Sequence, residues 1–531
     1  MRRRHRVPVL LSTALVGALA LQPVAAHAVR GTTAVRHTSE VGLGASAHHV
    51  KGGTLFQHKK PNAQEHDQFL KLKIPTVTLR PRNQSRVVEV QRKGPASSGA
   101  PASDRSKITI PYFVNTDHLT SSSLLDPNDP NVAAFENKVV VTNNEVISFS
   151  VDGGHTFHTF NVGSLYADRP AGGVCCDQVI RYAPSINRFI WIDQYWTASG
   201  HSDNLDRLAV FPPSSVTAGG LTSWTYWDIT AAELPGTHPF LDYPDLALGS
   251  NYVYFSSDAG AACCSVNQSV IARIGLDNLQ NGLNLAAGPH AWRYLDQVLL
   301  GGQVTQNTLG RAFWARNIDN SHIQVNSWSE SSTSYLSPAA VVAIGSWPNT
   351  DYTTTTPDGK TWLATYTGAV IGEARGGPKN DSLWFAWTAG RGSGKLSWLS
   401  QVHVELVQIS ASTLGLISQR AIWNPAHTFA YPALTTNPAG QLAISMAWGG
   451  GCCYVNFAVG NLTTSPFLVI NATSSTANCL CGRWGDYFGI GPANQVDRPN
   501  AFVAAGYGFS APPAGGPATY DPHFVGYQID P

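Results

Sequence analysis

The sequence predicts an all-β fold, specifically a β-propeller of about seven four-stranded blades. Composition, a recurring strand pattern and the scarcity of long helical patterns point to it. The 531 residues include 49 Gly and 33 Pro, which favour turns, and 15 Trp, 18 Tyr and 20 Phe, which favour strands. Charged residues make up only 13% of the chain, against about 25% in an average soluble protein. A single long all-β domain therefore fits the length better than several mixed domains.

The strand pattern recurs, and the same Tyr-Pro pair opens two of its copies. Tyr243–Leu248 leads into the aromatic run Tyr252–Phe255, and Tyr431–Leu434 leads into Leu442–Met446. The later copies are about 60 residues apart, which leaves room for four strands and long loops in each copy. Counting copies predicts seven blades, with six as the alternative. A two-sheet sandwich would also alternate, but it would not give this period.

The last copy contains only three strand patterns: Tyr487–Pro492, Ala501–Gly506 and His523–Ile529. A ring of blades leaves no unpaired edge when a segment from the other end of the chain completes its last blade. We therefore expect Lys107–Tyr112 to supply the fourth strand, so that an N-terminal strand closes the last blade.

The first residues have the features of a secretory signal. A basic run, Arg2–Arg6, precedes the apolar stretch Val7–Val24 and the small-residue site Ala26–Ala28. The uninterrupted apolar part is shorter than the ~20 residues of a spanning helix, which argues against the alternative of a membrane anchor. We expect residues 1–28 to be a signal peptide and the protein to be secreted.

Residues 29–105 differ in composition from the rest of the chain. Lys, Arg, Ser, Gln and His dominate there, and Gly94–Pro101 has the composition of a linker. We expect a poorly ordered N-terminal extension and linker over residues 29–105, either a solvated tail or an attachment segment. The propeller domain is then expected over residues 106–531.

Ser150–Phe157 reads Ser-Val-Asp-Gly-Gly-His-Thr-Phe and matches the pattern S-x-D-x-G-x-T-F/W. In such a turn the Asp and Ser side chains bond the backbone of the turn itself, and glycine allows positive φ. The chain thereby resembles the Asp-box (BNR-repeat) sialidase-like β-propeller superfamily, as a divergent secreted member. The resemblance covers about residues 107–531. It implies that this turn joins the third and fourth strands of a blade and faces away from the active site.

All eight cysteines lie downstream of Val174, as Cys175-Cys176, Cys263-Cys264, Cys452-Cys453 and Cys479-Leu480-Cys481. An even count in an exported chain favours disulfides, and no Cys-x-x-Cys spacing supports the metal-site alternative. The pairs precede inner strands or follow second strands, two loop types that open on the same face of a propeller. We therefore expect them to staple the functional face, by links between Cys452-Cys453 and Cys479/Cys481 or, alternatively, between adjacent residues.

On the same face, polar residues stand at the starts of the inner strands. We expect their side chains to converge on the axis of the propeller. Carboxylates and tyrosines there suit acid–base and nucleophilic glycan chemistry, while arginine suits acidic sugars and aromatic rings stack on sugar rings. The candidates are Asp242, Tyr243, Asp245 and Asp486 as catalytic residues and Asp177, Gln178, Glu373, Arg375, Tyr431, Arg483, Trp484 and Tyr487 as substrate-binding residues. The structural alternative is that Asp beside Pro caps a turn and that Arg483 and Asp486 form a buried ion pair.

Two functions follow from these residues. The first is a glycan-acting enzyme, a glycoside hydrolase or a polysaccharide lyase. The second is a non-catalytic glycan- or protein-binding propeller, because the early Asp168-Arg169-Pro170 departs from the Arg-Ile-Pro motif of true sialidases. A net charge of +1 gives no reason to expect nucleic acid as a partner. We expect a monomer that binds carbohydrate or glycoconjugate, without a membrane span, metal or cofactor.

Overall fold

The computed structural model describes residues 36–51, 88–89, 109–117, 128–166, 172–197, 203–234, 239–261, 266–299, 303–363, 371–375, 381–451, 453–463, 468–477, 484–511 and 518–530. The chain divides into two compact units, Met1–Thr33 and Ala34–Pro531, and all described residues belong to the second. The expected signal peptide lies outside the described residues. Within the described part, no helix is long and apolar enough to cross a membrane.

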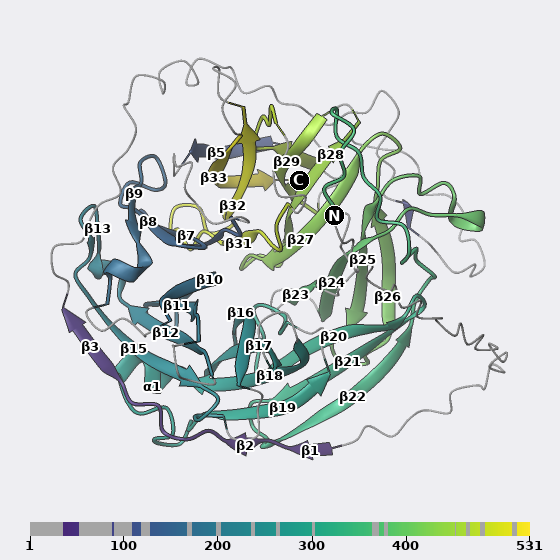
Figure 1. Ribbon diagram of the computed structural model, residues 1–531. Coiled ribbons are helices and arrows are strands. Elements are labelled where there is room, and N and C mark those ends of the chain that lie inside the picture. Colours follow the sequence, from purple (N-terminus) through teal and green to yellow (C-terminus); the bar gives the residue numbers. More distant parts are fainter. Residues whose placement is uncertain are drawn as a thin grey trace, which may run out of the picture. The chain divides into compact units, whose positions relative to one another are not determined.

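The second unit is an all-β propeller with seven blades, as the repeat count predicts (Figure 1). Blade 1 comprises β6 (Asn131–Phe135), β7 (Lys138–Asn143), β8 (Val146–Ser150) and β9 (His158–Asn161). Blade 2 comprises β10 (Val174–Ala183), β11 (Arg188–Tyr195), β12 (Leu205–Phe211) and β15 (Ser223–Thr230). Blade 3 comprises β16 (Phe240–Leu248), β17 (Tyr252–Gly260), β18 (Val266–Gly275) and β19 (Arg293–Leu299). Blade 4 contains β20 (Arg311–Asp319), β21 (His322–Ser329) and β22 (Ser334–Ala343).

Blade 5 comprises β23 (Ile371–Arg375), β24 (Ser382–Ala389), β25 (His403–Ser410) and β26 (Leu416–Ile422). Blade 6 comprises β27 (Thr428–Thr436), β28 (Leu442–Gly450), β29 (Cys453–Asn461) and β30 (Leu468–Asn471). Blade 7 comprises β31 (Gly489–Pro492), β32 (Phe502–Ser510), β33 (Thr519–Asp530) and β5 (Thr109–Asp117). The strands β13 (Val216–Thr217) and β14 (Gly220–Leu221) form a small ribbon, and α1 (Leu276–Asn281) is the one α-helix among the described residues.

The N-terminal strand closes the ring as predicted. β5 pairs antiparallel with β33, with Phe113 opposite Tyr527 and Thr116 opposite Phe524. The strand runs from Thr109 to Asp117 and therefore continues past the predicted end at Tyr112. Strands from opposite ends of the chain thus share one blade, which satisfies the backbone edge that β33 would otherwise expose.

Part of the region expected to be a poorly ordered extension forms strands on the outer edges of blades. β1 (Arg36–Thr38) pairs with β22, β2 (Glu40–Val41) with β19, and β3 (His48–Lys51) with β15. β4 (Val88–Glu89) pairs with β26. Such pairing uses backbone N–H and C=O groups, which residues carry whatever their side chains. The polar composition of this segment therefore did not indicate these strands.

Alternating residues pack each blade against both of its neighbours. On β11, Trp191 is fully buried in a cluster with Phe149 and Phe160 of blade 1, whereas Ile192 joins a cluster with Leu241 and other residues of blade 3. Successive side chains of a strand point to opposite faces, so every blade is apolar on both sides. This explains why these strands read as continuous aromatic and aliphatic runs.

The Ser150–Phe157 segment joins the third strand of blade 1, β8, to its fourth, β9. The Asp152 carboxylate accepts hydrogen bonds from the N–H groups of His155 (3.1 Å) and Thr156 (3.0 Å) and from the Thr156 hydroxyl (2.6 Å). Gly154 has φ +92°, and a Cβ there would lie 2.1 Å from Phe524 of blade 7. Hydrogen bonds within the turn therefore stabilise its conformation, and Gly154 leaves room for Phe524 of the neighbouring blade.

Candidate active site at the inner strands

The inner strands of several blades share a bulge at their starts. The pairing register shifts between Cys176 and Val179 in β10, and between Asp242 and Asp245 in β16. At these bulges Asp177 and Tyr243 have positive φ values of 48° and 53°, a conformation rarely adopted by residues other than glycine. Tyr431 repeats this geometry in β27, with φ 53°. Such strain persists where the surroundings fix it, and it clusters at functional sites.

Polar side chains from the preceding blade hold these bulges. The N–H of Asp177 donates to Asn144 Oδ1 (2.9 Å), at the turn after the second strand of blade 1. The N–H of Tyr431 donates to Thr388 Oγ1 (3.0 Å), at the corresponding end of the second strand of blade 5. Asp177 and Tyr431 are thus fixed by contacts between neighbouring blades, whereas the N–H of Tyr243 donates to Asp242 of its own strand.

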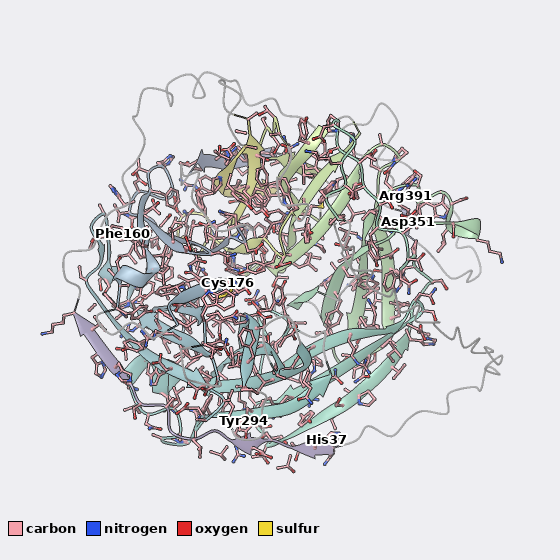
Figure 2. The ribbon with its side chains drawn as sticks, in the orientation of Figure 1. His37, Phe160, Cys176, Tyr294, Asp351 and Arg391 are labelled. Carbon is pink, nitrogen blue, oxygen red and sulfur yellow. A yellow bond between two sulfur atoms is a disulfide. The ribbon has the colours of Figure 1, made fainter. Side chains whose placement is uncertain are left out.

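Cys175 and Cys176 form a disulfide between adjacent residues directly before Asp177. Figure 2 labels Cys176 on the inner side of the ring of blades. This is the adjacent-residue alternative for that pair. Cys453 is also disulfide-bonded. The other five cysteines lie outside the described residues, so the link expected between Cys452-Cys453 and Cys479/Cys481 stays a prediction.

Tyrosines from opposite parts of the ring meet near the axis. The rings of Tyr243 in blade 3 and Tyr487 in the segment leading into blade 7 lie 5.5 Å apart, edge to face. The Tyr487 hydroxyl donates to the carbonyl oxygen of Gln178 in blade 2 (3.4 Å). Burial raises the pKa of Tyr487, and the negative charge of nearby Asp177, Asp129 and Asp245 adds to this. These residues form what we call the axial cluster, and five of them were predicted: Asp177, Gln178, Tyr243, Asp245 and Tyr487.

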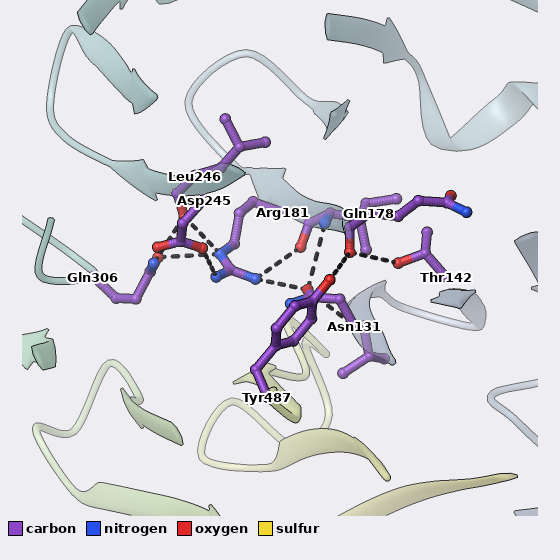
Figure 3. A network of polar contacts seen from close by, with 10 residues as sticks. Asn131, Thr142, Gln178, Arg181, Asp245, Leu246, Gln306 and Tyr487 are labelled. Carbon is purple, nitrogen blue, oxygen red and sulfur yellow. Dashed lines mark hydrogen bonds and ion pairs between the residues drawn. The ribbon is translucent and has the colours of Figure 1, made fainter. Parts of the chain in front are cut away.

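A buried ion pair fixes one side of the axial cluster (Figure 3). Arg181 of β10 donates from Nη2 to Asp245 Oδ1 (2.9 Å) and from Nη1 to Asn131 Oδ1 (2.7 Å). It also donates to the carbonyl of Leu246 (2.9 Å) and to Gln306 Oε1 (3.2 Å). Burial raises the pKa of Asp245 to about 6, although Arg181 opposes the shift. Arg181, held by Asp245, therefore joins blades 1, 2 and 3 to the segment that precedes β20 of blade 4, and the task of Asp245 is structural.

A second group of carboxylates lies where blades 2 and 3 meet. Asp242 of β16 is directly opposite Asp258 of β17, and both side chains are partly exposed. Burial raises the pKa of Asp258 to about 6, and nearby Asp242 contributes to the rise. Ser269 donates to Asp258 Oδ1 (2.6 Å). We call Asp242, Asp258 and Asp206 the carboxylate group.

Asp206 lies on β12, behind the other two carboxylates. It is fully buried, and the Ser257 hydroxyl interacts with its carboxyl group. Burial raises its pKa well above the ordinary value, and the negative charges of Asp242, Asp193 and Asp177 raise it further. Such surroundings favour the protonated, neutral form of this carboxyl group. The group therefore places two acids whose pKa values are raised by burial, Asp206 and Asp258, near a third, Asp242.

The remaining predicted residues divide between core and rim. Trp484 is fully buried against Tyr507 (5.1 Å between rings) and Trp362 (6.2 Å), so it is a core residue and not a surface for stacking on sugars. Tyr431 is buried with Trp362 and Phe488. The N–H of Asp486 donates to Asp129 Oδ1 (2.8 Å).

Three further candidates have no described side chain. Glu373 and Arg375 belong to β23, in which Arg375 pairs with Leu383 of β24. Arg483 lies outside the described residues. Their expected role in substrate binding stays a prediction.

Sequence reasoning missed Asp206 and Asp258, because it considered only the starts of inner strands. Asp206 lies on the third strand of blade 2, and Asp258 lies on the second strand of blade 3. An acidic residue inside a strand next to a Cys pair, as Asp258 is to Cys263-Cys264, would have been a usable signal. Among the described residues no group of three or more His, Cys, Asp or Glu side chains has the arrangement of a metal site.

No protein-family model matches the sequence, and no curated protein is similar to it. Among solved structures the chain is similar to an α-L-arabinanase of Penicillium chrysogenum, with 10% identity, a TM-score of 0.36 and coverage of 79% of this chain and 98% of that one. It is also similar to a Trypanosoma rangeli sialidase, with 10% identity, a TM-score of 0.35 and coverage of 68% and 58%.

A third similar structure is a puromycin-hydrolyzing peptidase of Mycobacterium tuberculosis, with 11% identity, a TM-score of 0.36 and coverage of 72% and 52%. The match thus spans little more than half the length of the sialidase and of the peptidase. The printed activities of the three proteins differ, and at these scores the likeness does not decide among them. The geometry of the site has to carry any functional argument.

Proposed function

We propose that the chain is a secreted, glycan-acting hydrolase whose reaction takes place at the carboxylate group of blades 2 and 3. The observation that carries the proposal is the pairing of Asp242 with Asp258 on neighbouring strands, in unequal environments. Glycosidases use two carboxyl groups, one of which must hold a proton while the other is ionised.

The pair suits these two roles. Asp258 is the acid, because burial raises its pKa to about 6. Asp242 Oδ1 accepts hydrogen bonds from the N–H of Tyr243 (3.1 Å) and from Gln194 Nε2 (3.3 Å), and such bonds stabilise a carboxylate. Cβ atoms directly opposite each other in an antiparallel sheet are about 4.5–5.5 Å apart. Side chains at such positions can bring their carboxyl groups to the separation of about 5–5.5 Å that the retaining mechanism uses, and this is the mechanism we propose.

The steps then follow from the two roles. Asp258 gives its proton to the glycosidic oxygen, which leaves with the aglycone, while Asp242 attacks the anomeric carbon and forms a glycosyl ester. Asp258, now ionised, takes a proton from a water molecule, whose oxygen displaces Asp242 and releases the sugar. Tyr243, held partly exposed beside Asp242 by its strained backbone, offers a ring face to the sugar.

The test is a turnover screen of the mature protein against aryl glycosides and polysaccharides. The variants are Asp242→Asn and Asp258→Asn. Asp277→Asn is the matched control, because Asp277 lies on α1, after the third strand of blade 3 and at the opposite end of the blade. We expect turnover that both site variants abolish and the control keeps. If turnover occurs and neither site variant reduces it, the assignment is wrong.

The second candidate is a non-catalytic binding propeller. It is favoured by the structural tasks of Asp245 and Trp484, two residues expected to handle substrate. Binding of a glycan measured by calorimetry, without turnover of that glycan by the wild-type protein, would select this alternative.

A further inference from the structure

The Cys175–Cys176 disulfide lies at a position that recurs in three blades. In β10 the pairing register shifts directly after Cys176, and the next residue, Asp177, has positive φ. β16 and β27 repeat this bulge, with Leu241-Asp242 and Phe429-Ala430 in place of the two cysteines. Because the bulge forms there without adjacent cysteines, the disulfide is not needed to form it. Its presence in blade 2 therefore calls for another explanation.

The two cysteines differ in their exposure. Cys175 is only 1% exposed, and Leu241 and Phe429 are buried at the equivalent position. Cys176 is partly exposed, like the equivalent Asp242 of the carboxylate group. A thiolate opens a disulfide by attacking a sulfur that it can reach, and exposed disulfides are the more easily reduced ones. Cys176 is therefore the residue at which an external thiol would react.

The pairing of β10 with β11 brings Cys176 close to the carboxylate group. Cys176 pairs with Gln194 of β11. The side chain of Gln194 donates from Nε2 to Asp242 Oδ1 (3.3 Å) and to the carbonyl oxygen of Leu241 (3.0 Å). A single residue of β11 thus connects the disulfide with the equivalent pair of residues in blade 3.

The backbone directly after the disulfide contacts two other parts of the ring. The N–H of Asp177 donates to Asn144 Oδ1 of blade 1 (2.9 Å), and the carbonyl oxygen of Gln178 accepts from the Tyr487 hydroxyl in the segment leading into blade 7 (3.4 Å). Residues other than glycine keep a positive φ only where their surroundings hold it. The covalent link between the two cysteines restricts the backbone immediately before Asp177. Opening the link therefore removes a restraint on these contacts.

We propose that Cys175–Cys176 is a thiol–disulfide exchange site that an external dithiol of low molecular weight opens. A thiolate of the dithiol attacks Cys176 Sγ, the bond to Cys175 Sγ breaks, and Cys175 leaves as a thiolate that takes up a proton. The second thiolate of the dithiol then attacks the first sulfur of the dithiol and releases Cys176, which also takes up a proton. The dithiol is oxidised to a cyclic disulfide, and the protein gains two thiols.

The closed form is the resting state of the site, because disulfides persist in the oxidising surroundings to which the proposed secretion leads. Opening the link loosens the start of β10 and its contacts with Asn144 and Tyr487. The exchange does not depend on the proposed hydrolysis, since none of its steps involves a substrate at the carboxylate group.

The first measurement is thiol labelling of the folded full chain. Dithiothreitol is the probe, and iodoacetamide alkylates the thiols that it produces. Mass spectrometry follows the tryptic peptide 139–181, which contains Cys175 and Cys176 and no other cysteine. A parallel reaction in urea gives the labelling of the unfolded chain. We expect the folded chain to reach at least half of that labelling.

The second measurement is hydrogen–deuterium exchange of backbone amides, for which Cys175→Ser/Cys176→Ser is the matched variant. We expect dithiothreitol to raise the exchange of β10 about fivefold or more in the wild type, and the variant to show this raised exchange without dithiothreitol. Because the variant keeps the other cysteines, it separates the effect of this link from theirs. β27 has the same bulge without adjacent cysteines, so its exchange should be equal in the variant and in the oxidised wild type.

Two results would overturn the proposal: labelling of peptide 139–181 only in urea, or unchanged exchange of β10 when the disulfide is open. If the variant does not fold, the exchange of β10 in the wild type, measured when peptide 139–181 is fully labelled, decides by the same criterion. Turnover enters neither measurement, so failure of the proposed hydrolysis would leave both results unaffected.

Discussion

Two aspartate sites in this propeller make opposite use of the same side chain. In the Ser150–Phe157 turn, the carboxylate of exposed Asp152 is saturated by hydrogen bonds from His155 and Thr156, which help to lower its pKa. Where blades 2 and 3 meet, burial dominates, and the pKa of Asp258 is raised to about 6. A carboxylate with all its partners inside its own turn stabilises structure. One that is buried among other acids retains a proton that it can transfer.

The largest expected effect is on catalysis at the carboxylate group. Asp258→Asn should lower kcat/KM by about 10²–10⁴-fold, the usual contribution of a general acid–base residue. In the wild type kcat/KM should fall as pH rises through about 6, because Asp258 must be protonated and burial raises its pKa to about 6. The measurement is a pH–rate profile from pH 4 to 9. A profile that stays flat above pH 6 contradicts the assignment.

The next effect concerns the ion pair of the axial cluster. Arg181→Met leaves Asp245 buried without its partner and should lower the free energy of unfolding by about 3–5 kcal/mol. The double variant Arg181→Met/Asp245→Asn should recover much of that loss, because no unpaired charge remains. Urea denaturation measures both. Equal stability of the single and double variants would show that the pair is not the cause.

A smaller loss of stability is expected in the Ser150–Phe157 turn. Asp152→Ala removes the acceptor of four hydrogen bonds in an exposed turn and should lower the free energy of unfolding by about 1–2 kcal/mol. Turnover should stay within the error of the wild type. Loss of activity without loss of stability would contradict the purely structural role assigned to Asp152.

The smallest effect is a change in how stability depends on pH. Burial raises the pKa of Asp193 from 3.8 to about 8, so the folded protein binds this proton more tightly than the unfolded chain does. The resulting stabilisation is complete below about pH 4 and is lost as pH rises through about 8. Asp193→Asn cannot ionise, so its melting temperature should fall less between pH 5 and 9. Parallel curves for both proteins would exclude this role of Asp193.

Features of the fold that depend on local pattern were predictable. The aromatic strand Tyr252–Phe255, the turn after Ser150 and the closing strand near Lys107–Tyr112 all follow from alternation, turn residues and the missing strand of the last copy. The edge strands β1 to β3 were not predictable, because backbone pairing leaves almost no trace in side-chain composition.

The site was predicted only in part. The rule that inner-strand starts converge selected Asp177, Gln178, Tyr243, Asp245 and Tyr487, which do lie together. The same rule selected Trp484, which packs in the core. Position along a strand places a residue at the axis, but whether its side chain faces the axis or the core depends on packing between blades.

The sequence by itself determined the repeat and favoured seven blades over six, because periodicity and turn chemistry are local properties. Only the tertiary structure decided which polar groups meet. Asp245 forms an ion pair with Arg181, which lies 64 residues earlier in the chain. Asp242 lies opposite Asp258 because of the pairing register of β16 and β17. Burial and partner charge, which set the proton affinity of each carboxyl group, exist only once the blades have packed.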